Sequence, residues 1–169
     1  SPAGDVELTA MLDALELAPF AALAGPDRIL SGSASGEVSL STVAGSISRV
    51  ETDLAIESAR YADGKIDATG KIDLALGLQG LAPESPVRIQ AVFAPTSGGR
   101  VDMNATGTVA GALRAALRFD AFDVKVLAPL LPEGTEFAGK LTGELELAST
   151  AERELVALDG RLRVGGARL

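Results

Sequence analysis

Apolar and polar residues alternate along most of this chain with a period of two. In residues 72–78, Ile72, Leu74 and Leu76 alternate with Asp73 and Ala75, and the same pattern recurs in other short segments. Successive side chains of a β-strand point to opposite faces of a sheet, so the pattern predicts strands with one apolar face. Such strands are expected at 12–17, 37–41, 50–56, 66–67, 72–78, 87–93, 101–105, 113–119, 141–147 and 162–164.

Clusters of Gly and Pro separate these segments at short intervals, as in 83–86 and 97–99. Short turns between amphipathic strands are typical of an antiparallel meander. The sequence therefore predicts nine or ten antiparallel strands that collect aliphatic side chains on one surface. We expect this surface to contain Val38, Leu40, Leu54, Ile56, Ile66, Ile72, Leu74, Leu76, Val87, Ile89, Phe93, Val101, Met103, Leu113, Leu117, Phe119, Leu145 and Leu147.

Two segments interrupt the alternation and predict short helices, at 19–24 and 126–132, where Pro and Gly limit their length. Helices this short do not cover a sheet face of the predicted size. We therefore expect an all-β fold with one long antiparallel sheet curled into a U-shaped half-pipe, and a β-sandwich is the alternative. A lipocalin barrel is disfavoured because the chain has no Trp, and the few aromatic residues do not supply the girdles of an outer-membrane barrel.

Part of the sequence occurs twice. Residues 12–17 match 119–124, and Gly32-x-x-x-Gly36-Glu37 matches Gly139-x-x-x-Gly143-Glu144, both at an offset of 107 residues. Beyond Leu147 a shift of one residue places Leu162 opposite Leu54 in the alignment. We interpret residues 1–169 as one β-rich segment of a larger protein with about one and a half repeat units, 12–118 and 119–169.

Composition excludes several functions. The chain has no His and no Cys, which removes Ser-His and thiolate catalysis, and we expect no enzyme, no cofactor and no metal site. The net charge of −8 disfavours nucleic acid as a partner and electrostatic docking on anionic lipid headgroups. Any affinity for lipid must therefore act through the acyl chains.

The repeated element is more specific than the alternation. An apolar-Asp-Ala-apolar-acid-apolar strand, a short Leu/Phe/Pro segment and a Gly-x-x-x-Gly-Glu-apolar-x-Leu strand occur in 12–41 and again in 119–147. This element resembles the C-terminal region of TamB-family proteins, which are AsmA-like bridge proteins of Gram-negative envelopes. The resemblance implies a β-taco with an aliphatic groove, a periplasmic location in an inner-membrane-anchored protein, and an outer-membrane barrel partner of the TamA kind reached through other parts of the protein.

The leading functional hypothesis is thus a non-catalytic conduit segment for phospholipid between the inner and outer membranes, linked to outer-membrane protein assembly. One alternative is a structural or interaction β module without ligand. Another is a chaperone-like trough that receives unfolded outer-membrane strands by edge pairing. Edge-to-edge self-association of the segment is also expected, because exposed strand edges pair readily.

Overall fold

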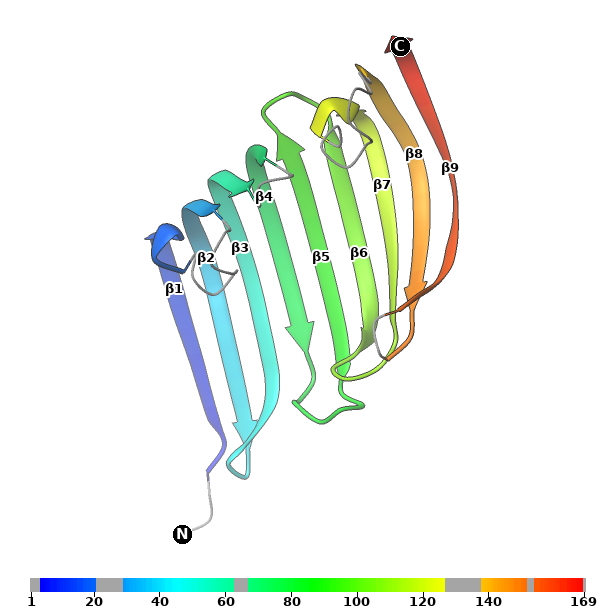
Figure 1. Cartoon of the computed structure of the whole chain (residues 1–169). Helices are drawn as coiled ribbons and strands as arrows, with labels where there is room; N and C mark the ends of the chain where they lie inside the picture. The colour runs from blue at the N-terminus through cyan, green and yellow to red at the C-terminus, as the bar shows by residue number, and fades with distance from the viewer. Residues whose placement is uncertain (1–3, 21–28, 63–66, 127–137, 152–153, 169) are drawn as a thin grey trace.

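A computed structural model describes residues 4–20, 29–62, 67–126, 138–151 and 154–168. These residues form nine strands, the short 3-10 turn η1 (Ala18–Phe20) and a second 3-10 turn at 124–126 (Figure 1). The strands are β1 (Val6–Glu16), β2 (Ile29–Val43), β3 (Ser46–Ala62), β4 (Asp67–Leu78), β5 (Pro86–Pro95), β6 (Arg100–Thr108), β7 (Leu113–Asp123), β8 (Ala138–Ser149) and β9 (Leu155–Arg168).

All nine strands belong to one sheet, in chain order from β1 to β9, and every neighbouring pair is antiparallel. The sheet is a single curled layer that does not close, because β1 and β9 lie at opposite edges (Figure 1). The predicted all-β half-pipe is confirmed. The alternative β-sandwich is wrong, since the described strands provide no second sheet to pack against the first.

The connecting segments differ in detail from the expectation. Of the helix predicted at 19–24, the structure shows the turn η1, and the remainder lies outside the described residues. Of the helix predicted at 126–132, the structure describes only residue 126, which ends a 3-10 turn at 124–126, and 127–132 lie outside the described residues. β6 extends to Thr108, three residues beyond the strand expected at 101–105.

β-Bulges occur at matching places in β1 and β7. The register shifts between Leu12 and Leu15 in β1 and between Phe119 and Phe122 in β7. Within these bulges Ala14 and Ala121 have φ values of 50° and 47°, a left-handed conformation that is uncommon for a non-glycine residue. Bulges bend a strand and increase its twist, so they account for curvature of the sheet around Ala14 and Ala121.

The side chains that contact these bulges also correspond. The N–H of Ala14 donates a hydrogen bond to Ser35 Oγ at 3.0 Å, and the N–H of Ala121 donates one to Thr142 Oγ1 at 3.3 Å. Both donors and both acceptors are 107 residues apart. The backbone of β1–β2 and that of β7–β8 are therefore fixed by the same local interactions.

The fully buried core of the described residues is small. Its apolar members are Ala34, Ala59, Ala62, Ala105, Phe122, Val124 and Leu141. The chain exposes 11041 Å², whereas a compact protein of 17.2 kDa exposes about 7,800 Å². The difference of roughly 3,000 Å² agrees with a single-layer sheet, since the described residues form no second sheet over its apolar face.

Candidate functional site

The candidate site is the apolar face of the sheet, and the strand register assembles it. Residues directly opposite each other on neighbouring antiparallel strands point to the same side. Following the register from β1 to β9 therefore shows which side chains share a face. One row across all nine strands consists of Ala10, Val38, Thr52, Leu76, Ile89, Ala105, Ala115, Leu147 and Leu158.

Two residues further along each strand, a second row has the same character. It consists of Leu12, Gly36, Leu54, Leu74, Ala91, Met103, Leu117, Leu145 and Gly160. The row on one side of this pair consists of Leu8, Leu40, Val50, Leu78, Val87, Gly107 and Leu113. The row on the other side consists of Leu15, Ala34, Ile56, Ile72, Phe93, Val101, Phe119, Gly143 and Leu162. We call these four rows the apolar face.

The structure brings together on this face every predicted site residue that it describes. Only Ile66 lies outside the described residues. The other 17 are all half-buried, with none fully buried and none in the exposed class. Half-burial is the state expected of side chains that are flanked by neighbours in their own sheet but have no layer packed over them.

One end of the apolar face is closed by an aromatic cluster. Phe122 packs against Phe119 at a ring-centroid distance of 5.9 Å and against Phe93 at 6.5 Å. Val124 and Leu141 complete the buried part of this cluster, and Val101, Val126 and Val164 pack around it. Ring pairs in such tilted arrangements are favourable, so the cluster is a rigid end to the face.

Sequence reasoning missed several residues of the face. Leu15 of the face and Phe122 of the aromatic cluster at its end were not expected, because strict alternation places residues three apart on opposite sides of a strand. The bulges at Ala121 and Ala14 change that phase. The repeated spacing of three between apolar residues, in Leu12-x-x-Leu15 and Phe119-x-x-Phe122, is the signal that could have indicated them.

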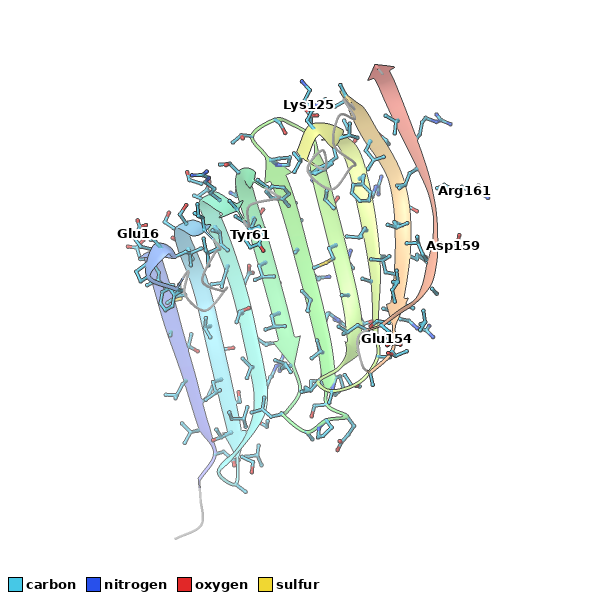
Figure 2. All side chains as sticks on the ribbon, viewed as in Figure 1. Glu16, Tyr61, Lys125, Glu154, Asp159 and Arg161 are labelled. Atoms are coloured by element: carbon cyan, nitrogen blue, oxygen red, sulfur yellow. The ribbon has the colours of Figure 1, made fainter. Side chains whose placement is uncertain are left out.

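The opposite face of the sheet is polar and carries both signs of charge. The register pairs Asp102 with Arg118, Arg118 with Glu144, and Glu144 with Arg161. Acidic and basic residues therefore alternate from β6 to β9. Figure 2 shows Arg161 and Asp159 projecting from β9 at the edge of the sheet. Mixed exposed charges of this kind are typical of a solvated surface.

Two cations on the polar face have shifted pKa values. A hydrogen bond to Glu57 and the charges of Glu57 and Asp73 raise the pKa of Lys71 above 10.5. A hydrogen bond to Asp102 and its charge raise the pKa of Arg100. A group whose pKa is raised in the folded state contributes its full stabilisation at any pH below its pKa in the unfolded state. This stabilisation is lost only as the pH rises through the pKa of the folded state. For Lys71 this loss begins above about pH 10.5, so both groups keep their charge at neutral pH.

Shallow hollows occur on the polar face where small residues lie between longer ones. A hollow of about 400 Å³ lies at Ala75 and Gly77, and one of about 520 Å³ lies at Ala116 and Ala148. Charged side chains line both, including Asp53 in the first and Arg114 in the second. These charges make the hollows poor receptors for an apolar ligand.

The described residues offer no other chemistry of comparable extent. Within 4–20, 29–62, 67–126, 138–151 and 154–168, no three acidic residues are grouped so as to hold a metal ion. No helix in these ranges has both the length and the apolar character required to cross a membrane.

Fold and site together define a class: an open, single-layer antiparallel β-sheet with one aliphatic and one charged face. The chain matches no protein-family model, no curated protein and no solved structure. The likeness to TamB-family proteins therefore depends on the repeated residues of the sequence alone.

Proposed function

We propose that the apolar face binds the acyl chains of phospholipid and that the chain is a non-catalytic segment of a lipid conduit. The observation that carries this proposal is the register, which collects aliphatic side chains from all nine strands on a face over which the described residues place no second layer. The ligand chemistry follows from the residues. The face is aliphatic over most of its extent and presents no formal charge in its four rows.

The energetic gain from covering this face is large. Complete burial of an aliphatic side chain contributes ~1.5–3 kcal/mol, and half-burial leaves on the order of 1 kcal/mol of this unrealised. For the 17 half-buried residues the total is on the order of 10–20 kcal/mol. Hydrocarbon tails supply such contacts without requiring hydrogen-bond partners, which the side chains of the face do not offer apart from the hydroxyl of Thr52.

The dimensions of the face suit acyl chains. Nine strands give eight spacings of about 4.8 Å, so the face extends about 38 Å across the strands. Four rows separated by two residues each extend about 20 Å along the strands. A surface of this size accommodates the tails of a phospholipid while the headgroup remains in water at its margin.

The resemblance to TamB-family proteins places this activity in a biological setting. In that setting the chain is a periplasmic section of a longer, inner-membrane-anchored conduit that moves phospholipid between the two membranes and supports outer-membrane protein assembly. A TamA-like partner would then bind other parts of the full protein. The residues described above contribute the acyl-chain track.

Native mass spectrometry with lipid extraction tests the proposal, on protein purified without detergent from bacterial envelopes. Leu76 and Ile89 face each other on β4 and β5, so Leu76→Asp or Ile89→Asp places a charge at the centre of the apolar face. The expected result is loss of bound phospholipid in protein that still folds, as measured by circular dichroism.

Matched controls are available on the same two strands. Ala75 and Gln90 are directly opposite each other on the polar face, so Ala75→Asp and Gln90→Asp should keep the lipid. A lipid-free parent protein that stays lipid-free after incubation with phospholipid vesicles contradicts the proposal. Equal loss of lipid in all four variants also contradicts it.

A further inference from the structure

The last two strands of the sheet repeat β2 and β3 residue by residue. The pairs Gly36↔Leu54 and Gly143↔Leu162 correspond, at offsets of 107 on one strand and 108 on the other. Both register shifts of β2–β3 also recur at these offsets. The corresponding pairs are Thr42↔Ile47 with Ser149↔Leu155, Ala34↔Ile56 with Leu141↔Val164, Ser33↔Glu57 with Lys140↔Gly165, and Ser31↔Arg60 with Ala138↔Arg168.

By this correspondence, the free edge of β9 is equivalent to the edge of β3 that pairs with β4. In β3 the edge that faces away from β2 is paired with β4 from Val50 to Ala62, with one register shift. In β9 the edge that faces away from β8 has no neighbouring strand within the part of the chain that the structure describes. As a result Leu158 and Leu162 are 62% and 47% exposed, whereas their counterparts Val50 and Leu54 are half-buried.

We propose that the edge of β9 binds an antiparallel β-strand with the alternation of β4. The β3–β4 register transfers directly: a residue like Ile72 would lie opposite Val164, and one like Leu74 opposite Leu162. Pairing in this register continues the apolar face by one strand. The inference concerns a polypeptide partner at the edge, and it is separate from lipid binding on the face.

Charge on the polar face favours the same partner. In the transferred register Asp73 of a β4-like strand lies opposite Arg163, where β3 has the uncharged Ala55. Opposite charges directly across two strands are stabilising. The preferred occupant is therefore a strand with aliphatic residues at alternate positions and an acidic residue opposite Arg163, not any exposed β-strand.

A cross-linking experiment with a peptide of residues 67–78 tests both the binding and the register. The natural chain has no Cys, so introduced thiols react without background. Leu162→Cys in the full chain should form a disulfide with a peptide that carries Cys at position 74. Arg161→Cys should do so with Cys at position 75, because Asp53, the counterpart of Arg161, lies opposite Ala75.

The exchanged combinations, Leu162→Cys with position 75 and Arg161→Cys with position 74, place the two thiols on opposite faces and should not cross-link. Successive side chains of a strand point to opposite faces, so the expected result is at least a tenfold excess of matched over exchanged products. Equal yields, or no cross-link in any combination, overturn the proposal. If Leu162→Cys does not fold, Val164→Cys with a peptide Cys at position 72 replaces it, with the same criterion.

Discussion

The first three strands and the last three have the same backbone arrangement but differ in how their bulge residues are packed. Leu15 in β1 and Phe122 in β7 occupy corresponding positions, 107 residues apart, directly after bulges of the same kind. Leu15 is 40% exposed, whereas Phe122 is 3% exposed. Local backbone geometry therefore does not determine the burial of these side chains.

The difference originates in the neighbouring strands. Phe122 packs against Phe93 of β5, and Val101 of β6 packs against the cluster that contains Phe122. Both strands lie on the side of β7 that faces the middle of the sheet. β1 has no strand on its corresponding side among the described residues. The comparison indicates that the bulge forms within each group of three strands, β1–β3 or β7–β9. Burial of the residue after the bulge depends instead on the strands next to that group.

The largest expected contrast is at these two positions. Phe122→Ala should lower the free energy of unfolding by about 3–4 kcal/mol, because it empties the centre of the aromatic cluster. Leu15→Ala should cost only about 1 kcal/mol, since Leu15 is 40% exposed and its removal leaves no enclosed cavity. Urea unfolding of both variants measures the two costs, and equal values would remove the distinction between the units.

Two glycines should instead behave alike. Gly36 and Gly143 have φ values of 146° and 142°, and a Cβ on either would lie 2.0 Å from a backbone oxygen, of Asp53 or Arg161. Gly36→Ala and Gly143→Ala should each destabilise the protein by about 2 kcal/mol. Gly77→Ala is the control, because its Cβ would meet no atom within 4 Å. Unfolding midpoints that differ strongly between the first two variants would contradict the equivalence of the units.

The side-chain hydrogen bonds to the bulges offer a finer test. Ser35→Ala and Thr142→Val each remove the acceptor for the N–H at the bulge, of Ala14 or Ala121. Both bonds are exposed to solvent, so each loss should cost about 0.5–1 kcal/mol. Amide hydrogen exchange should accelerate at the bulge on the same strand pair and not at its counterpart. Acceleration at both bulges would show that the units are not independent.

The smallest effect should be a gain in stability. Ala14 and Ala121 adopt the left-handed conformation at φ values of 50° and 47°, which costs a non-glycine residue roughly 1–2 kcal/mol. Replacement by Gly removes this strain but adds about 0.5–1 kcal/mol of chain entropy. Ala14→Gly and Ala121→Gly should therefore each stabilise the fold by about 0.5 kcal/mol, measured as a raised thermal midpoint. A lowered midpoint would contradict the assigned backbone conformation.

The sequence predicts the face well because a period of two survives wherever the strands are regular. Over the described residues, β4 pairs with β5, β5 with β6 and β6 with β7 without a register shift. Alternation in any one of these strands therefore specifies the face of its neighbours. Residues such as Leu76 and Ile89 could be assigned to the same surface from their spacing alone.

Prediction fails where the period changes or where the alternation is weak. The bulges at Ala14 and Ala121 shift the phase by one residue, and no single residue type marks such a change, so Leu15 and Phe122 were missed. At the edges, Met11 interrupts the pattern of β1, and the adjacent Leu155 and Val156 begin β9 without alternation. Leu8 and Leu158 were therefore not recognised as members of the face.

The central claim, that acyl chains contact the apolar face, is tested most directly by fluorescence. The chain has no Trp, so Ile89→Trp and Gln90→Trp each give one emitter, on opposite faces of the same strand. Phospholipid brominated in its acyl chains should quench Trp at position 89 strongly and Trp at position 90 hardly at all. Equal quenching at both positions, or quenching at neither, would contradict binding of lipid to the apolar face.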